Sequence, residues 1–137
     1  MLFRSQMPQS SPRPRIAIVV DDESLLSALA FSLEAEGYET AAFRTPSELL
    51  QRPPPLDCLL IDHRFAEMDA LEAIAAARQR GVNAPAVIIA GKPTPRFRKR
   101  AAAAAVGIVD KPLVGDELLG RIRAVLAGDQ NPDSARP

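Results

Sequence analysis

Short apolar runs alternate with helical segments along most of the chain. Most of the runs are continuous stretches of Val, Ile and Leu, which is typical of strands buried on both faces of a sheet. The segments between them repeat apolar residues every three or four positions, as amphipathic helices do. The runs that we predict as strands are residues 16–20, 38–43, 58–61, 86–90 and 106–109. The segments that we predict as helices are residues 25–36, 46–51, 70–80, 96–105 and 115–127.

The regular alternation of strands and helices predicts an α/β fold with a parallel sheet. Right-handed crossovers between parallel strands place helices on both faces, which makes the sheet doubly wound. We expect five strands in the order 2-1-3-4-5, flanked by five helices. The turn residues agree, because Gly37 and Gly81 can end the first and third helices and Pro53–Pro55 prevents extension of the second.

The composition allows a single domain. With 137 residues, 47% of them hydrophobic, the chain can build one core but has no room for a second. Residues 1–14 and 129–137 are rich in polar residues and Pro and lack periodicity, so we predict disordered tails around a folded domain at residues 15–128. We therefore expect a stand-alone domain without an attached output domain.

Charge and hydropathy limit the classes of partner. The 17 basic and 17 acidic residues cancel, so no overall field attracts the protein to nucleic acid or to a membrane. The first residues lack the apolar core of a signal peptide, and no apolar stretch approaches the ~20 residues that span a bilayer. The single Cys58 lies in an apolar run, where we expect a small buried side chain rather than a redox group. These features favour a cytoplasmic protein that binds neither nucleic acid nor membranes.

Acidic residues follow two of the predicted strands. Asp21 and Asp22 come directly after the first strand, and Asp62 follows the third. Because ligands bind beyond the carboxyl ends of the strands in such a sheet, we expect these side chains to converge at that edge. Closely packed carboxylates repel one another, and a hard divalent cation such as Mg²⁺ relieves the repulsion. The alternative is that Asp21 and Asp22, with Glu23, only cap the following helix.

A lysine after the fifth predicted strand changes the balance between these two interpretations. Lys111 would add a fixed positive charge at the same edge of the sheet, and its bond to Pro112 can adopt the cis form. Together with the three aspartates, this lysine favours a site that holds a phosphate group.

Three motifs, in this order and on alternating strands, resemble those of the response-regulator receiver family of two-component signalling. This family has a CheY-like fold of the flavodoxin-like type. The likeness covers nearly all of residues 15–128. The motifs are VVDDE at residues 19–23, IDHRFAEMDA at residues 61–70 and DKP at residues 110–112.

The resemblance implies a role for each polar residue. Asp62 would accept a phosphoryl group from a sensor histidine kinase or a phosphotransfer protein, acting as a nucleophile on phosphorus. Mg²⁺ would be held by Asp22, Asp62 and the backbone carbonyl of Arg64, with Asp21 acting through water. Lys111 would pair with a phosphate oxygen in the product. Such a signalling module is not an enzyme, apart from slow self-dephosphorylation.

Two positions depart from the family pattern. Receivers usually have Thr or Ser at the end of the fourth strand and Tyr or Phe three residues before the lysine, whereas this chain has Ala90 and Ile108 there. The usual conformational switch therefore lacks both partners, and Thr94 is a candidate for a displaced hydroxyl. Arg64 and Lys92 would flank the phosphoryl site, so we expect an altered phosphate lifetime.

Two further polar features are open to a plain and a functional interpretation. His63 is the only histidine and has no metal-binding spacing, so we interpret it as loop surface. The basic run at residues 96–100 is either solvated helix surface, the plain interpretation, or a patch that suits an acidic partner surface. In receivers, the face made by the fourth helix, fifth strand and fifth helix often binds a downstream protein or a second copy of the chain.

The sequence thus supports two hypotheses on function. The first is a single-domain response regulator that is phosphorylated on Asp62 in a Mg²⁺-dependent manner and signals through partner proteins. The alternative is a pseudo-receiver that acts as a protein-binding adaptor independently of phosphorylation, which Ala90 and Ile108 favour. An enzyme of the flavodoxin-like or dehalogenase-like type would need a Ser/Thr/Gly-rich phosphate loop or a D-x-D pattern after the first strand, and the sequence VVDDESLL has neither.

Overall fold

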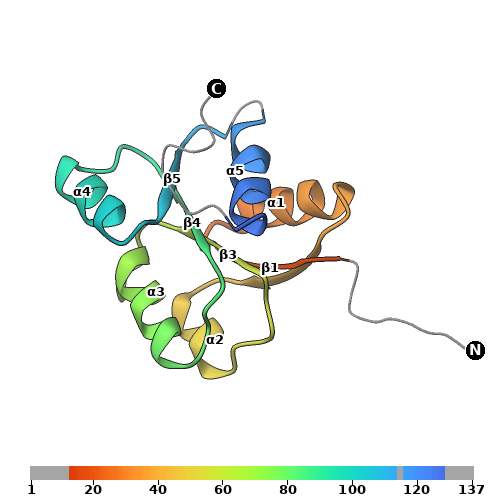
Figure 1. Cartoon of the computed structure of the whole chain (residues 1–137), viewed down its shortest axis with the longest axis horizontal. Coiled ribbons are helices and arrows are strands. Elements are labelled where there is room, and N and C mark those ends of the chain that lie inside the picture. Colours follow the sequence, from red (N-terminus) through yellow and green to blue (C-terminus); the bar gives the residue numbers. More distant parts are fainter. Residues whose placement is uncertain (1–12, 114–115, 129–137) are drawn as a thin grey trace, which may run out of the picture.

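A parallel sheet with helices on both sides forms the domain (Figure 1). The structure, a computed structural model, describes residues 13–113 and 116–128. The strands run in the order β2-β1-β3-β4-β5. They are β1 (Arg15–Val19), β2 (Glu39–Phe43), β3 (Cys58–Asp62), β4 (Ala86–Ala90) and β5 (Gly107–Asp110). The helices are α1 (Glu23–Ala35), α2 (Pro46–Gln51), α3 (Ala70–Gln79), α4 (Pro95–Ala103) and α5 (Glu117–Leu126).

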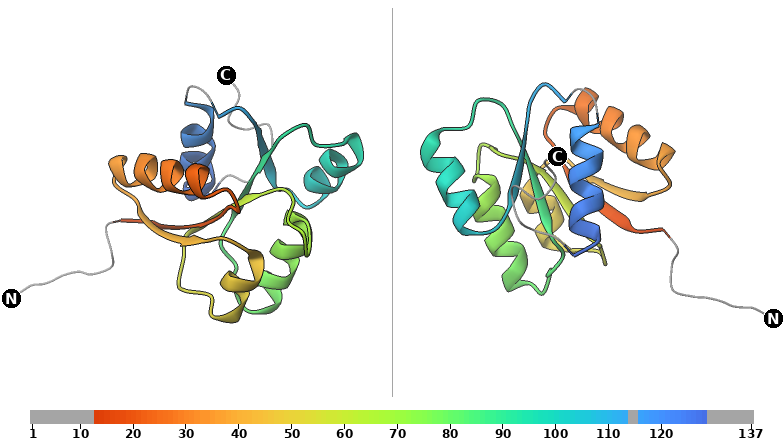
Figure 2. Two further views of the ribbon diagram at one scale, coloured as in Figure 1. Left: turned by 180° about the vertical axis from the view of Figure 1, so that it is seen from behind. Right: turned by 45° about the horizontal axis from the view of Figure 1, so that its top comes forward.

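The helices form two layers that enclose the sheet. α1 and α5 lie on one face, and α2, α3 and α4 lie on the other (Figures 1 and 2). Each layer packs on its own hydrophobic cluster, and β3 contributes to both: Leu60 belongs to one cluster, while Leu59 and Ile61 belong to the other. Successive side chains of a strand point to opposite faces. A continuous apolar strand therefore needs a helical layer on each side.

Side-chain caps fix where four of these helices begin. Asp22, Thr45, Asp69 and Thr94 precede α1, α2, α3 and α4, and each side chain accepts a hydrogen bond from a backbone N–H in the first turn. A short oxygen-bearing side chain can satisfy such an N–H group, which has no partner within the helix. Each of the four loops that precede these helices is thereby hydrogen-bonded to the first turn of its helix.

The observed fold confirms the predicted doubly wound sheet and its strand order. Each strand and helix begins and ends within two residues of the predicted bounds. Gly37 and Gly81 end α1 and α3 with φ values of +96° and +87°, which favour glycine. α4 ends earlier than predicted, because Ala105 has a φ of +58° and leaves the helical conformation.

The predicted tails lie almost entirely outside the described residues, at residues 1–12 and 129–137. At the described start of the chain, the Pro14 carbonyl accepts a hydrogen bond from the Glu39 N–H at 3.0 Å. Residue 14, which was predicted to belong to the tail, therefore contacts the edge strand of the sheet. None of the helices within the described ranges is long and apolar enough to cross a membrane.

The buried thiol of Cys58 gives a direct test of the core. Its side chain is fully buried at the start of β3, which confirms the predicted placement. Burial, together with the charge of Asp57, raises the pKa of the thiol to about 12. Because the thiolate is the reactive form, we expect the folded protein to resist a disulfide reagent such as Ellman's reagent at mildly alkaline pH. The chain unfolded in guanidinium should release one equivalent of dye, and rapid labelling of the folded protein would contradict this core.

Candidate functional site

The carboxyl edge of the sheet brings together residues that are far apart in the sequence. Asp62, the last residue of β3, lies beside Ile89 of β4, and Ala90 lies beside Asp110 at the end of β5. The backbone N–H of Lys111 then donates to the Ala90 carbonyl at 2.8 Å, and the bond from Lys111 to Pro112 is cis. The register of the strands therefore delivers Lys111 to the same edge as Asp62.

Asp62 and Lys111 form an ion pair at this edge. Lys111 Nζ donates to Asp62 Oδ2 at 3.0 Å, and the backbone N–H of His63 donates to Asp62 Oδ1 at 2.8 Å. The Asp62 side chain is only 13% exposed, whereas that of Lys111 is 34% exposed. Lys111 also passes close to Gly91, where an added Cβ would lie 3.7 Å from the lysine Cδ. The result is a carboxylate of fixed position with a cation directly beside it.

The other two aspartates have partners of their own. Asp22 accepts a hydrogen bond from the Leu25 N–H at 3.1 Å and so caps α1, as the alternative interpretation predicted. Asp21 is 76% exposed at its side chain and lies 3.8 Å from Arg44 Nη2, and its backbone carbonyl accepts from Arg44 Nε at 2.8 Å. Within residues 13–113 and 116–128, no three Asp, Glu, His or Cys side chains are arranged to hold a metal ion.

In this arrangement of side chains, Asp21, Asp22 and Asp62 each contact a different partner, because carboxylates repel one another and each has a donor or cation close at hand. Their convergence on one metal ion stays a prediction. The chemistry of the donors nevertheless suits Mg²⁺, because Asp22, Asp62 and the backbone carbonyl of Arg64 offer only oxygen atoms. Carboxylate oxygens can also accept more than one contact each.

The loop after β3 is closed by backbone hydrogen bonds. The Ala70 N–H donates to the His63 carbonyl at 2.9 Å, and the Phe65 N–H donates to the Met68 carbonyl at 3.0 Å. Arg64 pairs with Asp69 in an isolated antiparallel bridge. The segment that follows Asp62 is thus a compact turn, and it leads directly into α3.

The two departures from the family pattern lie where the sequence placed them. Ala90 ends β4 and is fully buried, and Ile108 in β5 is partly buried against the cluster under α2, α3 and α4. Thr94, the candidate for a displaced hydroxyl, instead caps α4 by accepting from the Phe97 N–H at 3.1 Å. The described chain therefore has no hydroxyl at the end of β4.

His63 is not loop surface, and that interpretation was wrong. Its side chain is only 15% exposed and packs edge-on against Phe97 of α4, with ring centroids 5.5 Å apart. Burial lowers the pKa of His63, and the charges of Arg64 and Lys111 lower it further, although Asp62 opposes them. His63 Nδ1 is buried 3.8 Å from Asp62 Oδ1, too far for a hydrogen bond. The reason for the error is that Phe97, far along the chain, covers the ring.

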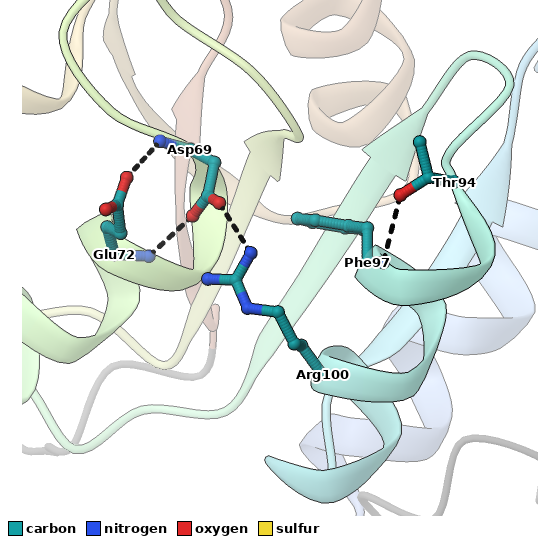
Figure 3. Close-up of polar contacts among 5 residues, drawn as sticks. All are labelled: Asp69, Glu72, Thr94, Phe97 and Arg100. Carbon is teal, nitrogen blue, oxygen red and sulfur yellow. Dashed lines mark hydrogen bonds and ion pairs between the residues drawn. The ribbon is translucent and has the colours of Figure 1, made fainter.

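A polar contact that the sequence interpretation missed joins α3 to α4 (Figure 3). Asp69 Oδ1 accepts from the Glu72 N–H at 2.8 Å, and Glu72 Oε1 accepts from the Asp69 N–H at 2.9 Å, which completes a capping box. Asp69 Oδ2 accepts from Arg100 Nη1 at 2.9 Å. The D-x-x-E pattern at Asp69 and Glu72 is typical of a capping box and could have predicted it. The contact with Arg100 on α4 could not be predicted from the local sequence.

Sequence comparison decides between the families that share this type of sheet. The profile of the response regulator receiver domain matches residues 16–123. The chain belongs to this family. Its members are the signalling modules of two-component systems. Ala90 and Ile108 therefore differ from the usual switch residues within the receiver family itself.

Individual relatives agree with this assignment. The chain is 32% identical over 114 residues to the response regulator protein TodT of Pseudomonas putida, covering 81% of this chain and 50% of TodT. It is 33% identical over 121 residues to the phosphate regulon transcriptional regulatory protein PhoB of Rhizobium meliloti, covering 82% of this chain and 52% of PhoB. The chain thus spans about half the length of the curated relatives that it matches.

Solved structures share the receiver fold. A CheY-like receiver domain protein from Methanospirillum hungatei superposes with a TM-score of 0.76 at 25% identity, covering 85% of this chain and 95% of that protein. The crystal structure of FixJ-N superposes with a TM-score of 0.75 at 21% identity, covering 85% of this chain and 96% of FixJ-N. The second likeness shows the fold alone.

The cap and the ion pair of Asp69 can be separated by substitution. Asp69→Ala loses both, and we expect it to lower the free energy of unfolding by about 1–2 kcal/mol. Asp69→Asn keeps a capping side chain and loses only the ion pair with the exposed Arg100, so it should lower the free energy of unfolding by less than Asp69→Ala does. Urea denaturation of the receiver domain and both variants would measure these losses, and equal losses would contradict the separate roles.

The ion pair also predicts a dependence on pH. Partial burial acts to raise the pKa of Asp69, but hydrogen bonds from Arg100 and from the Glu72 N–H outweigh it, so the pKa lies below its ordinary value of 3.8. The added stability is therefore fully present above the ordinary pKa and is lost as the pH falls through the lower folded value. The difference between the wild type and Asp69→Asn should disappear in that acidic range, and a difference that is unchanged there would contradict the ion pair.

Proposed function

We propose that this receiver domain belongs to a cytoplasmic response regulator and that its Asp62 accepts a phosphoryl group from a sensor histidine kinase or a phosphotransfer protein. The observation that carries this proposal is the contact of Asp62 Oδ2 with Lys111 Nζ at 3.0 Å. A nucleophilic carboxylate needs a fixed position, and the transferred group needs a cation beside it. Both conditions are met at the carboxyl edge of the sheet.

In the proposed transfer, Asp62 takes the phosphoryl group directly from the donor. An Asp62 carboxylate oxygen forms a bond to phosphorus while the bond from phosphorus to the donor imidazole nitrogen breaks. That nitrogen keeps the electron pair of the broken bond, and Asp62 becomes an acyl phosphate. Lys111 remains protonated and shifts its hydrogen bond from the Asp62 carboxylate to an oxygen of the phosphoryl group.

The proposed donors for Mg²⁺ are the carboxylates of Asp22 and Asp62 and the backbone carbonyl of Arg64, with Asp21 acting through water. When bound, the ion would neutralise charge on the phosphoryl group during transfer. These oxygen donors come from the segment between β1 and α1, the end of β3 and the loop after β3. The hydrogen bonds from the His63 N–H and from Lys111 hold the Asp62 carboxylate in place.

Output would pass through a partner protein. The proposed contact surface is the face of α4, β5 and α5, which would bind a downstream protein or a second copy of the chain. α4 carries the basic run Arg96–Arg100, with Phe97 buried beneath it. A basic surface of this kind suits an acidic partner.

A second candidate function rests on the switch positions. Ala90 offers no hydroxyl to follow a phosphoryl group, and Ile108 offers no aromatic ring to turn inward. These two residues favour a pseudo-receiver adaptor whose protein binding does not depend on phosphorylation. The two functions differ in whether Asp62 gains a phosphoryl group and whether this gain changes partner binding.

Phosphorylation by a small donor distinguishes the two functions. Purified protein incubated with phosphoramidate and Mg²⁺ should gain about 80 Da in intact mass, the mass of one phosphoryl group. Asp62→Asn should gain nothing, because an amide is not a nucleophile of this kind. The gain should also fail when Mg²⁺ is removed with EDTA. An unmodified wild type, tested also with a cognate kinase, would favour the adaptor.

The role of Lys111 is tested in the same assay. We expect Lys111→Gln to slow the gain of mass by about a hundredfold or more, as loss of one donor to a developing oxyanion commonly does. Lys99→Gln is the matched control, because Lys99 is an exposed lysine of α4 and lies outside the site. Equal rates in the wild type and Lys111→Gln would show that the ion pair does not serve the transfer.

A further inference from the structure

A basic pocket lies between the β3–α3 loop and the start of α4, outside the pair of Asp62 and Lys111. It has a volume of about 330 Å³ and is open to solvent. Neither Asp62 nor Lys111 lines it, although His63, the neighbour of Asp62, does. The residues that line it include Arg64, Lys92, Thr94, Arg96, Phe97 and Arg100.

The charges in this basic pocket do not cancel. Arg100 pairs with Asp69 at 2.9 Å, and Asp69 is the only acid among the described residues that line the pocket. Among the described residues, no carboxylate forms an ion pair with Arg64, Lys92 or Arg96. Three cationic residues, from the β3–α3 loop, the β4–α4 loop and α4, therefore line one pocket, and none of them is paired with a carboxylate of the described residues.

One wall of the basic pocket is held in place before any ligand arrives. Figure 3 shows the Arg100 guanidinium between Asp69 and the Phe97 ring, and its carbon lies 5.9 Å from the centre of that ring. Thr94 Oγ1 accepts from the Phe97 N–H at 3.1 Å, which leaves its own hydroxyl proton able to donate. Groups whose positions are fixed in advance lose less entropy when a ligand binds.

We propose that the basic pocket binds a small phosphorylated molecule with at least two adjacent phosphate groups. A single carboxylate would neutralise one of the three unpaired cations, whereas a diphosphate carries enough charge to contact all three. Arginine side chains bind phosphate oxygens through paired N–H groups, and lysine adds a point charge. The basic pocket adjoins the proposed phosphoacceptor site through Arg64 and Lys92, but neither Asp62 nor Lys111 lines it, so anion binding there does not require phosphorylation of Asp62.

Pyrophosphate is the probe for this site. Isothermal titration of the full chain with pyrophosphate, without Mg²⁺ and at constant ionic strength, should give saturable binding at one site. Arg96→Gln and Lys92→Gln should each weaken binding about tenfold, the effect of losing one charge-assisted contact. Orthophosphate should bind at least about tenfold more weakly than pyrophosphate for the same reason.

Two matched variants locate the bound anion. Arg98 lies on the same helix as Arg96, but it pairs with Asp110 at 2.8 Å and does not line the basic pocket. Arg98→Gln should therefore leave the affinity for pyrophosphate unchanged. Asp62→Asn should also bind pyrophosphate with no loss, whether or not Asp62 is the phosphoacceptor. Thermal melts would confirm that these variants fold.

Several outcomes would overturn the proposal. They are the absence of saturable binding, an equal loss in Arg98→Gln and Arg96→Gln, and equal affinity for orthophosphate and pyrophosphate. Binding that is lost in Lys111→Gln but kept in Arg96→Gln would place the anion at the phosphoacceptor site instead. None of these results depends on whether Asp62 can be phosphorylated.

Discussion

Burial of the central strands on both faces is the constraint on which this structure depends. Leu59, Leu60 and Ile61 leave no side of β3 for solvent, so helices must cover both faces of the sheet. Each crossover then returns the chain to the same end of the sheet, and all strands finish at one edge. Polar residues that follow buried strands therefore collect at this edge, which makes it the place where chemistry can occur.

The ion pair of Asp62 and Lys111 is the clearest product of that constraint. The two residues are 49 positions apart in the sequence, and the register of β3, β4 and β5 brings them together. An aspartate that is largely shielded from solvent and paired with a lysine has a defined orientation. The same register places Ala90 beside Asp110 and Ile108 beside Ile88, so this receiver domain has the pair of Asp62 and Lys111 but lacks the usual switch residues.

The sequence predicted features that depend on short-range patterns and on topology. Alternating apolar runs gave the strands, their order gave the shared edge, and the positions of Asp62 and Lys111 followed from both. The positions of Asp21 and Asp22 were less predictable, because their side chains choose among partners such as Arg44 and the N-terminus of α1. The burial of His63 depends on Phe97, which lies in another helix, and no local pattern encodes such a contact.

We propose Asp62, held by Lys111, as the residue that receives the phosphoryl group. The most direct measurement is to locate the modified residue after phosphorylation by reducing the acyl phosphate with borohydride and sequencing the peptides by tandem mass spectrometry. We expect that position 62 alone is converted to homoserine, the alcohol formed by reduction of an aspartyl phosphate. Reduction at Asp21 or Asp22, or a phosphoryl group on a residue that borohydride does not reduce, would contradict it.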